Sequence, residues 1–291
     1  MIIFQLLINS LISGLILALI AVGFYLIFNT TKVFHIAHGA FYTLGGFIFL
    51  WFLEFMHISF FFSIIISLIC IIILSALVEL LIYKRLSKNN ASQAITLIAS
   101  MGIYLLLINP VVLVFGNESK IIQNYYSSSF DFSELILTQI QFIQFIISIV
   151  ILTIILLFGN SRFYLKIKAV MSNQDVASVL GINFNSIRIF SVCFGSVLAA
   201  IACILRLYDT GINPYSGLSM TLSAAVVVIL GGGYSLGGTI IASLLISFIQ
   251  SFTEFFISAQ WKEGITFLIL IVVILWKTEG IVNFKMRIEE K

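Results

Sequence analysis

The stretch from Thr210 to Thr253 reads TGINPYSGLSMTLSAAVVVILGGGYSLGGTIIASLLISFIQSFT. It contains no Asp, Glu, Lys or Arg, and most of its residues are apolar. A helix that crosses a bilayer needs roughly 20 mainly apolar residues, because each residue advances the helix by about 1.5 Å. The stretch is therefore long enough for two crossings, and it predicts a chain that passes repeatedly through a membrane.

The composition of the whole chain supports the same prediction. Of its 291 residues, 61% are hydrophobic and only 9% are charged, and the mean hydropathy is +1.17. A soluble domain usually carries about 25% charged residues, and a water-soluble fold of this composition would expose large apolar patches. Further charge-free stretches cover 135–161 and 189–205. The net charge of +3 gives no indication of a nucleic-acid partner.

We therefore expect an all-α fold, a polytopic bundle of transmembrane helices that forms a single domain over residues 1–291. About eight helices (8–9) are expected to span the bilayer. The second and seventh apolar segments are short and bordered by glycine, so broken or re-entrant segments are expected near 30–46 and 222–240. The apolar segments predict helices at about 4–28, 41–56, 58–83, 93–115, 138–158, 187–207, 219–230, 236–256 and 264–277.

Loop charges predict the orientation of the chain. The loop at 84–88 and the long loop at about 159–187 carry Lys and Arg with few acids, whereas 116–137 carries more acids than bases. Basic loops stay on the cytoplasmic side of a membrane. We expect the two basic loops and the tail after Trp276 to be cytoplasmic. The side of the N-terminus stays open, because it depends on whether 41–56 crosses fully.

Three polar, glycine-containing segments interrupt the apolar helices, and the first covers 30–46. Irregular backbone at membrane depth survives only where protein or a water-filled cavity covers it, so these segments are candidates for a transport path. In the first, His35, His38, Gly39 and Tyr42 lie beside the expected start of a helix. Free N–H groups at such a start can bind an anionic group such as a carboxylate. The alternative is that both histidines bind neighbouring backbone groups or lie at the interface.

The second segment contains Asn213, Pro214 and Tyr215, which is a turn signal; a plain extracytoplasmic loop is the alternative. The third contains Gly231, Gly232 and Gly233, which would break a helix at membrane depth. The sequence YTLGG at 42–46 returns nearly unchanged as YSLGG at 234–238. Paired glycine-interrupted helices in two halves of a chain point to a binding site in transporters built from repeats.

The long basic loop carries a different signal. Residues 168–181 predict one short amphipathic helix, with Val176, Val179 and Leu180 on one face and Gly181 as its end. A helix of this kind either lies on lipid or docks into a groove of a partner protein.

Several function classes find no support in the sequence. It contains no GxxxxGK[ST] phosphate-binding loop, no HExxH motif and no metal-ligand spacing, and its three cysteines lie in apolar segments. We expect neither an enzyme nor a metal protein. A stand-alone secondary transporter remains an alternative, although acids within the spans are scarce. A membrane scaffold is a further alternative, but it would gain nothing from irregular backbone in lipid.

Four motifs together point to a family. In chain order they are Ala37-His38-Gly39, Lys168-Ala…Ala177…Leu180-Gly181-Ile182-Asn183, Ile212-Asn213-Pro214-Tyr215…Gly217 and Leu230-Gly231-Gly232…Ser235…Gly238. With them the chain resembles, over nearly its whole length, the LivH-type permeases of branched-chain amino-acid ABC transporters. The family often has Asn, an acid and Lys where this chain has His35, Ala40 and Ser223.

The resemblance implies a multi-pass permease in the bacterial cytoplasmic (inner) membrane, which passes leucine, isoleucine or valine along a translocation path. It implies a second related permease, two cytoplasmic ATPase subunits and an extracytoplasmic substrate-binding protein as partners, with no cofactor in this chain because ATP binds the ATPases. The resemblance also implies that the loop carrying Asn173, Asp175, Ala177, Leu180 and Gly181 contacts an ATPase. Importers of urea and short amides use close relatives, so these substrates stay open.

Overall fold

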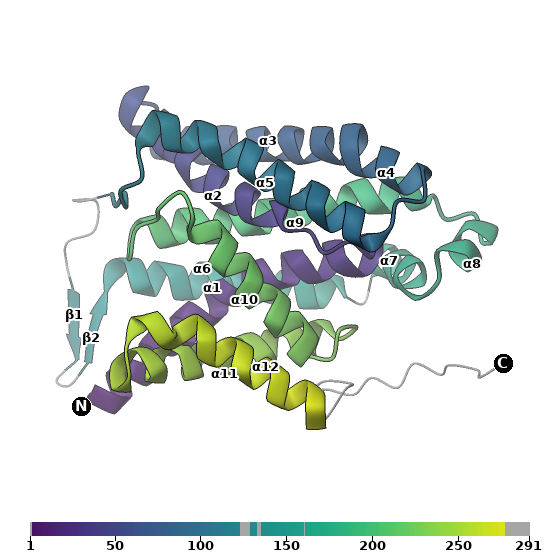
Figure 1. Ribbon diagram of the computed structural model, residues 1–291. Helices are drawn as coiled ribbons and strands as arrows, with labels where there is room; N and C mark the ends of the chain where they lie inside the picture. Colours follow the sequence, from purple (N-terminus) through teal and green to yellow (C-terminus); the bar gives the residue numbers. More distant parts are fainter. Residues whose placement is uncertain (1, 123–128, 133–134, 160, 277–291) are drawn as a thin grey trace.

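The computed structural model describes residues 2–122, 129–132, 135–159 and 161–276, which form a bundle of long helices (Figure 1). The helices are α1 (Ile2–Thr31), α2 (Ala37–Leu50), α3 (Phe60–Val78), α4 (Lys84–Lys88), α5 (Gln93–Phe115), α6 (Gln139–Phe158), α7 (Arg162–Ser172), α8 (Gln174–Val179), α9 (Phe184–Leu207), α10 (Ser216–Leu230), α11 (Leu236–Phe256) and α12 (Lys262–Trp276). Two π-helical turns, Trp51–Phe55 and Glu79–Tyr83, extend α2 and α3, and a 3₁₀ turn, Ala259–Trp261, precedes α12.

The predicted membrane bundle is confirmed. Within the described ranges, 7 helical segments are long and apolar enough to cross a membrane, and the shorter α10 is also apolar. Every expected apolar segment corresponds to an observed helix with boundaries a few residues away. The sequence prediction did not include the two short antiparallel strands β1 (Ser129–Phe132) and β2 (Leu135–Thr138). The expected position of the tail after Trp276 lies outside the described residues.

Helix α1 forms the centre of the bundle. It packs against α6, α9, α10 and α11, and most of its side chains are buried. Gly23 explains its close contact with α9, since a Cβ at this position would lie 2.6 Å from the carbonyl oxygen of Gly195. Because lipid tails are as apolar as the side chains, helices in a membrane associate where small residues let their backbones approach. The core is therefore built around small residues of α1 and α9.

The outer helices α3, α5, α6 and α12 carry large exposed apolar side chains. Thr266 is the one buried residue of α12 within the part of the chain that the structure describes. A surface of this kind would promote aggregation in water, but it is stable in contact with the lipid tails of a bilayer. Examples of these exposed side chains are Phe61, Ile98, Leu113, Leu157 and Leu275.

The two ends of the bundle differ in charge and in structure. Gln5 Nε2 donates to the Ile136 carbonyl at 2.9 Å, and Gln5 Oε1 accepts from the Ile136 N–H at 3.2 Å, so α1 starts beside the β-hairpin. Helices α4, α7 and α8, which form the two basic segments at 84–88 and about 159–187, lie at the opposite end (Figure 1). By the positive-inside rule we expect this basic end on the cytoplasmic side. Residue Ile2 would then lie on the extracytoplasmic side, which the sequence had left open.

The expected interruptions near 30–46 and 222–240 are connections between helices. Residues 32–36 join α1 to α2, and 231–235 join α10 to α11. Residues 32–36 are buried or half-buried, whereas 231–235 is more open and includes the exposed Tyr234. Helix α10 itself is continuous and runs from the hairpin end toward the basic end (Figure 1).

Candidate functional site

The first polar segment is buried at the start of α2. His35 is 1% exposed, and His38 and Tyr42 are 0% exposed. The Nε2 atom of His38 lies 3.3 Å from the carbonyl oxygen of Ile20 on α1. This contact matches the alternative in which a histidine binds nearby backbone. Within the described part of the chain, neither ring nitrogen of His35 has a hydrogen-bond partner.

The start of α2 does not offer its first N–H groups to a ligand in this structure. The Ala37 N–H donates to Ser100 Oγ of α5 at 3.0 Å. The next two N–H groups donate to the carbonyls of His35 and Ile36, at 3.1 and 2.9 Å. The expected anion-binding helix start is therefore occupied by the chain's own acceptors.

The structure brings the first and second segments together through Gly39 and Gly217. A Cβ on Gly39 would lie 2.9 Å from Thr221 Oγ1 and would also clash with the backbone of Gly217. A Cβ on Gly217 would in turn clash with the carbonyl of Gly39 and with Thr43. Helices α2 and α10 thus cross at backbone contact, directly beside His38.

The second segment is a capped turn at the extracytoplasmic end. Asn213 Oδ1 accepts from the Tyr215 N–H at 3.0 Å, which fixes the turn before α10. The Tyr215 hydroxyl donates to Asn117 Oδ1 at 3.2 Å. Lys120 and Ile212 exchange two backbone hydrogen bonds of 2.8 and 2.9 Å. The loop after α5 therefore holds this turn at the rim of the bundle, and Pro214 within it is buried.

The third segment lies at the other end of the bundle. Gly232 and Gly233 adopt positive φ angles of 94° and 59°, which side chains disfavour. Asn29 Nδ2 donates to the Gly233 carbonyl at 2.7 Å, and the Tyr25 hydroxyl donates to the Tyr234 carbonyl at 3.0 Å. The glycine turn thus packs on the cytoplasmic end of α1. The structure does not bring it beside Asn213.

The basic loop forms two helices where the sequence predicted one. The expected helix over 168–181 is interrupted at Asn173, whose extended backbone ends α7. Its Oδ1 atom accepts from the N–H groups of Asp175 and Val176, at 3.0 and 3.2 Å, and so caps α8. A side chain that caps a new helix favours a break over continuation. The predicted end at Gly181 is confirmed, since its φ is 76°.

Helix α8 is anchored on one side and exposed on the other. Ala177 is 1% exposed, whereas Val176, Val179 and Leu180 are 55%, 87% and 69% exposed. The anchoring reaches α1, because Gln174 Nε2 donates to the Thr30 carbonyl at 3.1 Å. An apolar face left open on an anchored helix at the cytoplasmic end is suited to bind another protein.

Helix α7 holds the loop against α1 and the glycine turn. Lys32 Nζ donates to the Met171 carbonyl at 2.8 Å and lies 4.9 Å from the ring centre of Tyr234. The hydroxyls of Tyr164 and Tyr25 are 3.4 Å apart. Burial raises the pKa of Tyr164 above its usual value, although a phenol is neutral at pH 7 even without this shift. The third segment and the basic loop therefore form one contact region.

Sequence reasoning missed two polar groupings inside the bundle. Glu79 of the π-turn after α3 and Arg188 of α9 form an ion pair, with side chains 1% and 3% exposed. An acid and a base in apolar surroundings could have suggested the pair, because unmatched charges in a membrane are costly.

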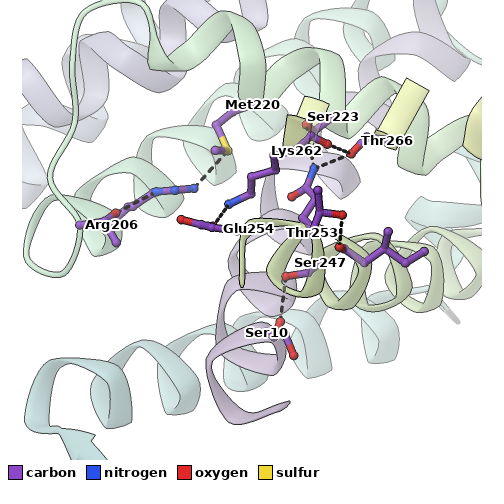
Figure 2. Close-up of polar contacts among 12 residues, drawn as sticks. Ser10, Arg206, Met220, Ser223, Ser247, Thr253, Glu254, Lys262 and Thr266 are labelled. Carbon is purple, nitrogen blue, oxygen red and sulfur yellow. Dashed lines mark hydrogen bonds and ion pairs between the residues drawn. The ribbon is translucent and has the colours of Figure 1, made fainter. Parts of the chain in front are cut away.

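The second missed grouping joins the last three helices. Gln250 Nε2 of α11 donates to Thr266 Oγ1 of α12 at 3.0 Å and to Ser223 Oγ of α10 at 3.4 Å. Figure 2 shows Ser223 and Thr266 on these neighbouring helices, together with the Lys262–Glu254 ion pair at the end of α11. Ser223 thus makes a polar contact between helices at the position where the family often has Lys.

Comparisons with known proteins agree with this architecture. The family model described as branched-chain amino acid transport system / permease component matches residues 6–274. The permease protein BraD of a high-affinity branched-chain amino acid transport system in Pseudomonas aeruginosa is 27% identical over 96% of this chain and 95% of its own length. The corresponding LivH protein of Escherichia coli is 26% identical over 94% of each chain.

Two further matches are more distant. The autoinducer 2 import system permease protein LsrC of Yersinia pseudotuberculosis is 32% identical over 48% of this chain and 42% of its own length. Among solved structures, PsaBC from Streptococcus pneumoniae in complex with Fab covers 92% of this chain and 89% of that chain, with 15% identity and a TM-score of 0.48.

The family match extends over nearly all the described helices, from α1 to α12. Permeases of this kind are multi-pass membrane proteins that carry no cofactor and do not themselves catalyse a reaction. With the resemblance in sequence, the helical bundle and the family match in agreement, this chain belongs to the branched-chain amino acid transport system / permease component family of ABC importers.

Proposed function

We propose that this chain forms half of the translocation path of an importer for leucine, isoleucine and valine. A second related permease would supply the other half. Two cytoplasmic ATPases would drive the cycle, and an extracytoplasmic binding protein would deliver the substrate. The family match and the printed names of the two near full-length relatives support the substrate class. The whole of 1–291 would act as one permease domain.

The observation that carries the proposal is the open apolar face of α8. Val179 is 87% exposed on a helix that Ala177 and Gln174 hold firmly against the bundle. We propose that an ATPase subunit covers this face, with Asn173, Asp175, Ala177, Leu180 and Gly181 shaping the docking element within the loop 159–187. A protein partner explains why an apolar face is retained on a short, capped helix.

We propose that the path runs along the crossing of α2 and α10. His35, His38, Gly39 and Tyr42 would line or support it from α2, and Asn213, Pro214 and Tyr215 would shape its extracytoplasmic mouth. The contact between Gly39 and Gly217 supports this grouping. Gly231, Gly232 and Gly233 would act at the cytoplasmic end, beside the docking element. Alternating access would then open the crossing, which is closed by close packing in this structure.

The proposal is tested by co-purification and uptake. The chain would be expressed and purified together with its second permease and its ATPases. The purified complex would be placed in lipid vesicles, and the binding protein would be added either inside the vesicles or to the outer solution. ATP-dependent uptake of labelled leucine, isoleucine and valine is expected. Urea is included because short amides stayed open on the sequence, and autoinducer 2 because a distant relative carries that name. If the vesicles take up urea or autoinducer 2 with ATP but none of the three amino acids, the substrate class proposed here is wrong. The absence of any bound ATPase would contradict the importer assignment of α8.

A further inference from the structure

The buried ion pair between Glu79 and Arg188 has no role in the function proposed so far. Its side chains are 1% and 3% exposed, whereas those of the second ion pair among the described residues, Glu254–Lys262, are 53% and 30% exposed. Removing one partner of a buried pair leaves an uncompensated charge, which is strongly unfavourable. The bundle must therefore keep these two side chains together whenever α3 or α9 moves.

Arg188 is joined to the docking helix α8 by a short, hydrogen-bonded connection. It lies in the second turn of α9, and residues 180–183 connect the end of α8 to the start of α9. The Ile182 N–H donates to the Ala177 carbonyl at 3.0 Å. Asn183 Oδ1 accepts from the Ser186 N–H at 3.2 Å and caps α9. These bonds hold the short connection between α8 and α9, so we expect a displacement of α8 to move the guanidinium group.

Glu79 is joined in a similar way to the segment before α2. It begins the π-helical turn Glu79–Tyr83, a distortion that occurs often at functional sites. The turn directs Tyr83 onto His35, with ring centres 4.5 Å apart and both side chains 1% exposed. His35 lies three residues before His38, next to the crossing of α2 and α10. These packed aromatic rings provide a contact route from Glu79 to the candidate path.

We propose that Glu79 and Arg188 are positioning residues that transmit the movement of α8 to the His35 segment and so couple ATPase docking to opening of the path. The inference rests on the proposed function. The contacts form a continuous chain from α8 through Arg188, Glu79, Tyr83 and His35. Continuity in space is not evidence of coupling by itself, so the proposal requires variants that separate coupling from stability.

The decisive variant replaces both charges. Glu79→Gln and Arg188→Gln together remove the ion pair without leaving an unmatched buried charge, so the chain is expected to insert and to assemble with its partners. Each single variant leaves one charge unpaired and is expected to assemble poorly. The matched control is Glu254→Gln with Lys262→Gln, which removes an exposed ion pair at the extracytoplasmic end. All are measured as full complexes in vesicles.

The readout is the amount of substrate taken up per ATP hydrolysed. Coupling between sites commonly changes an equilibrium by about 5- to 150-fold, so a drop of about tenfold is expected for the double variant, with its ATPase activity retained. The control is expected to stay within about twofold, since exposed pairs contribute little. Hydrogen exchange over 32–39 gives a second readout. ATPase binding is expected to change the exchange there in the unaltered complex but not in the double variant.

The outcomes are distinct. An unaltered complex that takes up no substrate with ATP contradicts the proposed function. A double variant with unaltered uptake per ATP overturns the inference and leaves the proposed function in place. If the double variant does not assemble, Arg188→Lys decides, because it keeps the charge but not the planar fork of arginine. Reduced uptake per ATP in that variant at normal assembly supports the inference, and unchanged uptake per ATP overturns it.

Discussion

Gly39 on α2 and Gly217 on α10 face each other so closely that neither position has space for a Cβ atom. A side chain at Gly39 would meet the backbone of Gly217 and the hydroxyl of Thr221, and a side chain at Gly217 would meet Thr43. Backbone atoms cannot rotate away as a flexible side chain can. The contact therefore sets the closest distance that the two helices, which carry the first and second polar segments, can reach in this closed arrangement.

The first prediction follows from this contact. Gly39→Ala is expected to destabilise the folded chain by about 1–3 kcal/mol, which is the usual effect of forcing an extra carbon into a packed interior. The thermal midpoint of the purified chain in detergent measures it. Gly102→Ala is the control, because a Cβ at Gly102 has no neighbour within 4 Å. Equal midpoints for the two variants would show that α2 and α10 do not cross at Gly39.

The second prediction concerns the docking face of α8. Val179→Asp places a charge at a side chain that is 87% exposed, so the fold of the chain should tolerate it. If an ATPase buries this valine, its affinity for the complex is expected to fall about tenfold or more. Titration of labelled ATPase onto the reconstituted permease measures the affinity. Asn185→Asp adds the same charge at an exposed position early in α9 and is expected to bind normally; an equal loss there would point to a general charge effect.

The third prediction concerns the hydrogen bond between Gln250 of α11 and Thr266 of α12. Thr266 and Thr253 each bind the carbonyl four residues earlier in the chain, but only Thr266 also accepts from Gln250 of another helix. Thr266→Val is expected to cost about 0.5–1.5 kcal/mol, the range of hydrogen bonds between membrane helices. Thr253→Val should cost less. Thermal unfolding of both variants measures the difference, and a larger loss for Thr253→Val would rule out the interhelical role.

The fourth prediction concerns the glycine turn. Asn29 and Asn109 both donate to a carbonyl four residues earlier, but Asn29 also donates to Gly233 at 2.7 Å. Asn29→Leu is expected to speed hydrogen exchange over 231–235 by roughly two- to tenfold, the effect of losing one net hydrogen bond. Asn109→Leu should leave that exchange unaltered. Unchanged exchange in the Asn29 variant would mean that α1 does not hold the turn.

Much of the fold could be predicted from the chain because membrane spans depend on local composition. Stretches such as 93–115 and 236–256 lack enough polar groups to be stable in water, and a helix satisfies all backbone groups of such a stretch within the segment itself in lipid. Their observed boundaries match the expected ones. The break between α7 and α8 at Asn173 was harder to predict, because an asparagine can either continue a helix or cap a new one. The β-hairpin was missed because each strand has only four residues: Ser129–Phe132 alternates polar and apolar residues too briefly to predict a strand, and Leu135–Thr138 runs into the apolar segment of α6.

The sequence by itself determined that the chain is a polytopic helical membrane protein of an importer family, since apolar spans, basic loops and four ordered motifs are properties of the chain. The tertiary structure alone decided which motifs meet. It placed Gly39 against Gly217, brought the glycines at 231–233 to the basic end of the bundle beside α1 and α7, and paired Glu79 with Arg188. These contacts join residues far apart in the chain, and their energies come from packing and charge compensation between helices, which no local pattern encodes.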